Sequence, residues 1–321
     1  MKFFVVSDVH GFYNELIRDL KNAGWDDNNS NHILIVCGDI FDRGTQPLEV
    51  YNFLRSIPKE RRILIRGNHE QLFKDLVDRQ FPEDHDHSNG TYKTVLNLCG
   101  YNSEDDFWQM NSFNIIPNRT LDYYENKYGV SKDKGSEVDR ELFWNKAFAE
   151  YSEYRNERLR QQREVKRQKI WYNPILKEIC DWIDSDEWVN YFETKDYIFV
   201  HGFIPYNQDY WTSNYGYIFK TGPKRFREDW RNATQDEWWD ATWFNWNASF
   251  RDIKNGLNQT SKYIVVGHWH TSDLFNNLRN SNAKKYYINN NPIFKSKKYK
   301  IIGLDTCTVV TKKINVLTFE E

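Results

Sequence analysis

The chain has 321 residues, with 44 lysines and arginines against 46 aspartates and glutamates and a formal net charge of −2. This balance gives no general attraction to nucleic acid or to an anionic membrane, and it argues against both as partners. No apolar stretch approaches a transmembrane span, and the opening apolar run ends at Asp8, which is too early for a secretory signal. We therefore expect a cytoplasmic globular enzyme with a substantial core, and we leave its oligomeric state open.

Cysteine spacing and aromatic content give weaker information. The four cysteines are scattered without Cys-x-x-Cys spacing, which predicts reduced thiols rather than a disulfide framework or a zinc finger. Aromatic residues make up 17% of the chain and include 13 tryptophans. We interpret most of them as core and surface anchors, and we assign no element to the tryptophan-rich segment 206–250.

The first predicted strand, over 2–7, ends in polar residues before an amphipathic helix over 12–23. Asp8 alone is consistent with a helix N-cap, but a cap does not explain His10 two residues later. A carboxylate and an imidazole at a strand end can bind one divalent cation.

A second predicted strand, over 33–36, leads into Gly38-Asp39-Ile40-Phe41-Asp42-Arg43-Gly44 and then a helix over 47–56. A charged turn is the alternative interpretation of this loop. In open α/β sheets, however, ligands bind at the carboxyl ends of the strands, where two acids and an arginine would share one pocket.

A third predicted strand, over 62–65, ends in Arg66-Gly67-Asn68-His69-Glu70. Three successive strand–loop–helix units predict a parallel sheet with right-handed crossovers. All three polar loops should therefore lie at one edge of that sheet.

Strand signals disappear over about 80–195, and we expect a mainly helical insertion there that caps or flanks the site. A charged, proline-free stretch over 140–170 predicts a helix with a basic exposed face, and Pro174 begins a further helix over 175–183. The metal-like run Asp84-His85-Asp86-His87 lies among proline, asparagine and glycine, so we favour a solvated turn over a second metal site.

Strands resume after the insertion. The strand over 197–200 ends at His201, and the strand over 262–266 ends in Gly267-His268-Trp269-His270. Stretches 300–304, 308–311 and 313–319 predict three further strands in a meander.

Five strand ends thus finish in side chains that can bind metal, whereas a single buried histidine is usually a satisfied core residue. Two cations about 3.5–4 Å apart can share a carboxylate, polarise a phosphoryl oxygen and hold nucleophile and leaving group in line. The mixed oxygen and nitrogen ligands suit Mn, Fe or Zn better than Mg or Ca. We expect two divalent ions, with Mn preferred.

The motifs together resemble the calcineurin-like metallophosphoesterases, and within them the phosphoprotein phosphatase branch and its bis-nucleoside tetraphosphatase relatives. They are Ser-Asp-Val-His-Gly at 7–11, Gly-Asp-Ile-Phe-Asp-Arg-Gly at 38–44, Arg-Gly-Asn-His-Glu at 66–70, His-Gly at 201–202, Gly-His at 267–268 and Asp-Thr at 305–306. The resemblance covers the chain outside the insertion. It implies an α/β fold: a β-sandwich flanked by helices, as one domain over 1–321 that the insertion interrupts.

The resemblance also implies a ligand set. One metal would be held by Asp8, His10 and Asp39, and the other by Asp39, Asn68, His201 and His268, so that Asp39 bridges. His270 matches a Gly-His-x-His pattern of the wider superfamily, and we expect it to bind the first metal. The alternative is that His270 only supports a ligand.

The implied mechanism is direct attack on phosphorus by a hydroxide bound to the two metals. His69 would protonate the leaving alkoxide, and Asp42 would orient that imidazole and raise its basicity. Arg43 would clamp two phosphoryl oxygens through its planar fork. Asn68 and His69 would also contact the substrate.

Two departures from the branch bear on the substrate. Phe203 stands where the branch has a glycine, and we expect it to narrow the pocket. A second phosphate-binding arginine is missing near Trp243, where the chain reads Trp-Phe-Asn; Arg251 or a residue of the insertion could replace it.

We predict a metal-dependent phosphomonoesterase, first as a serine/threonine protein phosphatase. The first alternative is hydrolysis of a dinucleoside polyphosphate or another small phosphate ester. A phosphodiesterase or nuclease is less favoured because Arg43 and the Asp42–His69 pair suit monoesters. The non-enzymatic alternative is a metal-stabilised binding scaffold.

Overall fold

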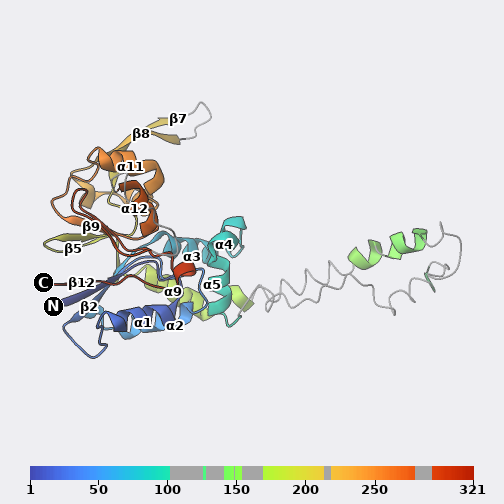
Figure 1. Ribbon diagram of the computed structural model, residues 1–321. Helices are drawn as coiled ribbons and strands as arrows, with labels where there is room; N and C mark the ends of the chain where they lie inside the picture. The colour runs from blue at the N-terminus through green and yellow to red at the C-terminus, as the bar shows by residue number, and fades with distance from the viewer. Residues whose placement is uncertain (102–125, 128–140, 148, 154–168, 213–217, 279–290) are drawn as a thin grey trace. The chain divides into compact units, whose positions relative to one another are not determined.

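The computed structural model describes residues 1–101, 126–127, 141–147, 149–153, 169–212, 218–278 and 291–321. These residues form two compact units. The first contains Met1–Leu98 and Pro174–Glu321, and the second contains Cys99–Asn173. Every element described in the next three paragraphs belongs to the first unit (Figure 1).

The first sheet has the strand order β12-β1-β2-β3-β4. Its strands are β12 (Leu317–Glu320), β1 (Lys2–Val6), β2 (His32–Cys37), β3 (Arg62–Ile65) and β4 (Trp188–Val189). The last four run parallel, while β12 is antiparallel to β1. The parallel sheet with its polar loops at one edge is therefore present as predicted, with β3 and helix α2 (Pro47–Ser56) at their predicted bounds.

The second sheet has the order β10-β11-β9-β6-β5. Its strands are β10 (Phe294–Ser296), β11 (Ile301–Gly303), β9 (Tyr263–Val266), β6 (Tyr197–Phe199) and β5 (Phe192–Glu193). Strands β11, β9 and β6 are mutually parallel, so His201 and His268 also follow carboxyl ends that lie side by side. The tryptophan-rich segment forms the hairpin of β7 (Tyr206–Thr212) and β8 (Ile218–Phe226), then α10 (Gln235–Thr242) and α11 (Trp246–Lys254).

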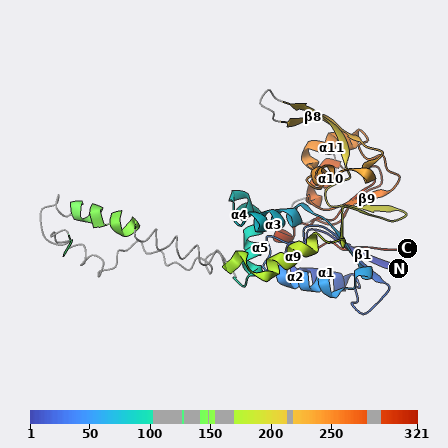
Figure 2. The ribbon, with the colours of Figure 1, turned by 180° about the vertical axis from the view of Figure 1, so that it is seen from behind.

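Helices cover the outer faces of the two sheets. Helices α1 (Tyr13–Asn22) and α2 lie beside the first sheet, and α11 and α12 (Thr271–Leu278) lie on the side of the second (Figures 1 and 2). One buried cluster joins alternate residues of both sheets, such as Phe3 and Val5 with Phe199 and Val265. This period-two pattern places the core between the sheets. The predicted β-sandwich flanked by helices is confirmed.

The prediction of three C-terminal strands in a meander is wrong. Residues Thr308–Thr311 form a short helix, α13, and β12 pairs with β1 rather than with β11. The Asp305 carboxylate accepts a hydrogen bond from the Cys307 amide, and the Thr308 hydroxyl donates to the Asp8 carbonyl 3.0 Å away. These tertiary hydrogen bonds outweigh the strand propensity of four β-branched residues.

The solvated turn predicted at 84–87 is also wrong, because these residues belong to helix α4 (Asp84–Asn89). Asp86 is fully buried and accepts hydrogen bonds from Arg79 and from the Glu83 amide. Asp86, which resembles a metal ligand in sequence, is therefore a capping and ion-pairing residue. Helix α3 (Asn68–Arg79), α5 (Thr91–Leu98) and α9 (Pro174–Ile183) complete this part of the first unit.

In the second unit, residues 141–147 and 149–153 are helical, and Phe143 is buried. The basic run at 158–167 lies outside the described residues, and the capping role of the insertion stays a prediction. Within the described part of the chain, no helix has the length and apolar character needed to cross a membrane.

Candidate active site

The polar loops of the two sheets adopt an unusual backbone conformation. Six of the ten described non-glycine residues with positive φ belong to the predicted motifs: Asp8, His10, Asp39, Asp42, Arg43 and His268. Left-handed conformations cost free energy for residues with a side chain and concentrate at functional sites. The fold therefore holds strained residues where the sequence places the chemistry.

Glycines allow the loops after β2 and β3 to meet. A Cβ atom on Gly38, whose φ is +77°, would lie 2.6 Å from the Gly67 Cα. A Cβ atom on Gly67 would lie 2.2 Å from the Asp39 Oδ1. Both positions therefore require glycine. Without side chains there, the two loops approach closely and Asp39 lies against the start of α3.

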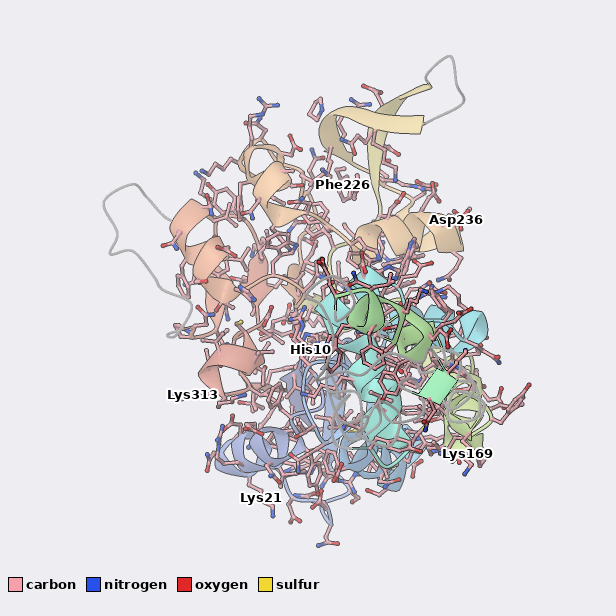
Figure 3. The ribbon with its side chains drawn as sticks, turned by 90° about the vertical axis from the view of Figure 1, so that its right-hand side faces the viewer. His10, Lys21, Lys169, Phe226, Asp236 and Lys313 are labelled. Atoms are coloured by element: carbon pink, nitrogen blue, oxygen red, sulfur yellow. The ribbon has the colours of Figure 1, made fainter. Side chains whose placement is uncertain are left out.

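His10, Asp39 and His69 form the first group of candidate ligands. The Asp39 Oδ2 lies 3.8 Å from the Nε2 atoms of both histidines. The His10 Nδ1 lies 2.8 Å from the Phe41 carbonyl, to which it donates as N–H, so its Nε2 is free to bind a metal. His10 is labelled in Figure 3 between the elements of the two sheets.

Asp39, His201 and His268 form the second group. The other Asp39 oxygen, Oδ1, lies 3.3 Å from the His201 Nε2. The His201 Nδ1 donates to the Cys37 carbonyl 2.7 Å away, and its Nε2 is 2.9 Å from the Asn68 Oδ1. Asp39 thus offers one oxygen to each group, which is the arrangement of a bridging carboxylate.

The two groups fit a pair of divalent cations. Their candidate ligand atoms lie within 4.8 Å of one another in each group. Ligands that share a metal at bonds of roughly 2.0–2.2 Å are expected roughly 3–4.4 Å apart, so small adjustments suffice. Nitrogen and carboxylate oxygen donors suit Mn, Fe or Zn.

Asp8 and His270 lie at the edge of this arrangement and belong to neither three-residue group among the described residues. Both Asp8 oxygens accept the His268 amide at 3.1 Å. The His270 Nε2 lies 4.0 Å from the Asp305 Oδ2. Although burial lowers the pKa of His270, a hydrogen bond with Cys307 and the charge of Asp305 raise it to about 9. The metal roles of Asp8 and His270 stay predictions.

The charges of the site act strongly on one another. Burial opposes ionisation of Asp39, but His201 and His69 outweigh it and hold the pKa of Asp39 well below its usual range. Burial lowers the pKa of His201, but the charge of Asp39 outweighs burial and raises this pKa to about 10. Burial and the charge of His201 lower the pKa of His268 to about 3. A compact set of ionised and neutral groups follows, as expected of a metal or catalytic centre.

His69 and Asp42 form a buried pair beside the first group. The His69 Nδ1 donates to the Asp42 Oδ2 across 2.6 Å, which leaves its Nε2 facing the site. Burial lowers the pKa of His69, but Asp39 and Asp42 more than compensate and raise it above its ordinary value. The Arg43 Nη2 lies 3.5 Å from the His69 Nε2, so the predicted acid, its partner and the phosphate clamp are together.

The structure adds supporting residues that sequence reasoning missed. The Thr91 hydroxyl donates to the Asp42 Oδ2 across 2.7 Å, and the Thr94 hydroxyl accepts the Asp42 amide at 2.9 Å. Both threonines lie on α5, about fifty residues after Asp42, and no local pattern connects them to it.

Glu70 is the second supporting group. Its carboxylate accepts the amides of Asp39, Ile40 and Gly67 at distances between 2.7 and 3.0 Å. Burial and the charge of Asp39 raise the pKa of Glu70 to about 7. In the sequence, the signal for this supporting residue is its position directly after Asn68 and His69. Its hydrogen bonds fix the loops that follow β2 and β3.

Phe203 does not narrow the pocket as expected. Its side chain is 1% exposed, stacks on Phe244 at 4.5 Å and belongs to the core beneath α10 and α11. At the missing arginine position, Asn245 caps α11 by accepting the Ala248 amide at 3.0 Å. Arg251 is exposed on α11, and no described contact connects it with the site.

Parts of the chain are similar in sequence to two curated phosphatases. The chain is 42% identical over 82 residues to Shewanella-like protein phosphatase 1 of Plasmodium berghei, which covers 22% of this chain and 23% of that protein. It is 28% identical over 113 residues to the asymmetrical bis(5'-nucleosyl)-tetraphosphatase PrpE of Halalkalibacterium halodurans, covering 33% and 44% respectively. The chain thus spans less than half the length of either relative.

Among solved structures, the I115M mutant of a cold-active protein tyrosine phosphatase aligns with a TM-score of 0.46 and 15% identity, over 100% of this chain and 75% of that one. The calcineurin-like phosphoesterase family profile matches residues 1–173, more than half of the sequence. The predicted enzyme class, a phosphoric ester hydrolase, is the class of that family. The chain belongs to the calcineurin-like phosphoesterase family.

Proposed function

We propose that this protein is a metal-dependent phosphomonoesterase that acts on phosphoserine or phosphothreonine. The observation that carries the proposal is the shared carboxylate of Asp39, which faces His10 and His69 with one oxygen and His201 with the other. Two cations in this geometry can act on one phosphoryl group.

The residues that would hold the cations are members of the two groups, other than His69, together with neighbouring residues of the same motifs. Asp8, His10 and Asp39 would hold one ion, with His270 as a further candidate, and Asp39, Asn68, His201 and His268 would hold the other. Mn is the preferred metal, with Fe or Zn as alternatives. The ions, when bound, would supply Lewis-acid polarisation of the phosphoryl group and activation of a water at neutral pH.

The protein's own groups would complete the reaction. Because Asp42 accepts the Nδ1–H of His69, the proton on Nε2 faces the site and can pass to the leaving alkoxide. A raised pKa keeps more of this imidazole protonated near neutral pH. Arg43, next to His69, would bind two phosphoryl oxygens and orient the substrate.

Two relatives' names support different substrates. One is called a protein phosphatase and the other a bis(5'-nucleosyl)-tetraphosphatase. The absence of an arginine at Asn245 favours the second candidate, a dinucleoside polyphosphate or another small phosphate ester. A diesterase is disfavoured because Arg43 and the Asp42–His69 pair suit a dianionic monoester and a poor leaving group.

The test is phosphate release by metal-stripped protein resupplied with Mn²⁺. The substrates are a phosphothreonine peptide, p-nitrophenyl phosphate and bis-p-nitrophenyl phosphate. We expect hydrolysis of the two monoesters, and a loss of roughly 10²-fold in kcat/KM for Arg43→Ala because a bidentate charge-assisted contact disappears. The matched control is Arg225→Ala, because Arg225 lies on β8 in an exposed ion pair with Asp209 on β7. Preferred cleavage of the diester, unaffected by Arg43→Ala, would contradict the proposal.

A further inference from the structure

A polar cavity of about 270 Å³ opens beside the candidate metal centre. Its walls come from the loop after β3, the first turns of α3, the end of α9 and one face of α10. Figure 3 labels Asp236 on α10. The lining includes Arg66, Glu70, Asp184, Asn190, Gln235 and Trp239.

The cavity and the site share a wall. Gly67 lines the cavity and lies against the Asp39 carboxylate, and the next two residues in the chain belong to the site. Aromatic rings form a second connection between the cavity and the site. Trp239 in the cavity wall packs edge to face on Trp243, with ring centroids 5.7 Å apart, and Trp243 packs on His268 with centroids 5.9 Å apart. Trp243 is 39% exposed, so a substrate bound at His268 has an open aromatic surface beside it. That surface leads to the cavity.

The cavity is lined by the guanidinium group of Arg66, which makes few hydrogen bonds with other described residues. Arg66 is half-buried, and its one side-chain hydrogen bond to described residues reaches the Ser185 carbonyl at the long distance of 3.5 Å. Within the described part of the chain, Arg66 makes no ion pair. A guanidinium carries five N–H donors in a rigid fork, so most of its donors are free for a ligand.

The acids near Arg66 are engaged elsewhere. The Glu70 carboxylate accepts three backbone amides, and Asp184 pairs with Lys74. The remaining lining is rich in amides, with the Asn190 Nδ2 donating to the Gln235 Oε1 at 3.3 Å. Asp184 and Glu70 attract the half-buried Arg66 guanidinium by charge, but neither hydrogen-bonds to it among the described contacts, so an incoming anion can still bind its free N–H donors.

We propose that this cavity is a second anion subsite of the substrate, in which Arg66 binds a phosphoryl or carboxylate group other than the one at the metal centre. The inference rests on the proposed function, because it takes the scissile phosphoryl group to lie at Asp39. It also assigns the chain a second anion-binding arginine in a different place from the missing position at Asn245.

The first experiment measures selectivity. For the Mn²⁺-loaded protein, kcat/KM is measured on two phosphothreonine peptides that differ by one neighbouring Glu or Gln, and on diadenosine tetraphosphate and adenosine monophosphate. We expect the substrate with the second anion to be preferred within at least one pair, and Arg66→Gln to reduce that preference about tenfold. Arg66→Lys, which keeps the charge but loses the fork, should lie between the two.

Lys177→Gln is the matched control, because it removes one positive charge from the exposed face of α9 in the same unit. It should leave both preferences within about twofold. A loss of preference in the peptide pair alone identifies a carboxylate as the ligand, and a loss in the nucleotide pair alone identifies a phosphoryl group. Equal preferences in the native protein and Arg66→Gln, or an equal loss of preference in Lys177→Gln, would overturn the proposal.

A binding measurement separates this proposal from the proposed function. The same peptide pair, made with thiophosphothreonine to slow hydrolysis, is titrated calorimetrically into the Mn²⁺-loaded native protein and Arg66→Gln. An affinity gain from Glu that disappears in Arg66→Gln supports the subsite even if no peptide is hydrolysed. If the native protein binds the Glu and Gln peptides with equal affinity, a carboxylate ligand is excluded. If the native protein and Arg66→Gln also show equal preferences in the nucleotide pair, the subsite is rejected and the proposed function stays intact.

Discussion

The two halves of the candidate metal centre are held in different ways. In the half that follows the first sheet, carboxylates and hydroxyls provide most of the support: Thr91 donates to Asp42, Asp42 accepts from His69, and the Glu70 carboxylate accepts the Asp39 amide. In the half that follows the second sheet, the backbone provides the support. The Cys37 carbonyl orients His201, and the His268 amide donates to Asp8. Under the proposed function, the first half would control protons, whereas the second would mainly fix imidazole positions.

Asp39 joins the two halves, so Asp39→Asn should have the largest effect. An amide cannot offer an anionic oxygen to both sets of histidines, and the buried histidines lose their counter-charge. We expect phosphate release to fall by at least about 10³-fold, and bound Mn to fall below two per chain by elemental analysis. Retention of two ions and of most activity would show that the halves are independent.

His69→Asn should affect only the half that controls protons. We expect kcat on a phosphothreonine peptide to fall roughly 10²–10⁴-fold, with a much smaller loss on p-nitrophenyl phosphate, whose leaving group needs no proton. Because the acid works in its protonated form and the pKa of His69 is raised, native kcat on the peptide should fall as the pH rises through a value on the alkaline side of the ordinary histidine pKa. This alkaline limb should be absent in the variant. Loss of metal from His69→Asn would instead identify His69 as a ligand.

Thr91→Val should produce the smallest of these effects while still acting through the same half. The substitution removes the hydroxyl that shares the Asp42 oxygen with His69, and we expect about a tenfold loss of kcat on the peptide with little change in KM or metal content. Thr91→Ser should restore activity. The control is Thr194→Val, because the buried Thr194 hydroxyl has no hydrogen-bond partner among the described residues. An equal loss in both valine variants would indicate a general structural effect.

The same contrast explains what the sequence could predict. The ligands of the first half follow buried strands within a few residues, so strand periodicity and residue chemistry located Asp39 and His69 together. His201 and His268 could be placed beside them once parallel strands were expected to share an edge. The supporting contacts of Thr91 could not be predicted, because they depend on how α5 packs.

Errors arose where tertiary contacts override local preference. Residues 308–311 have the composition of a strand but form a helix fixed by contacts to Asp8, and Asp86 resembles a metal ligand but is a buried cap. Phe203 was expected at the pocket because it stands where the resembling branch has a glycine, two residues after His201. At Phe203, however, the chain has already entered the aromatic core.

The central claim is that two cations act together through Asp39. The most direct measurement is a titration of metal-stripped protein with Mn²⁺, in which phosphate release from a phosphothreonine peptide and bound Mn are followed in the same samples. The account predicts that activity appears mainly as the second equivalent binds. Full activity at one equivalent, or activity that survives metal removal, would contradict it.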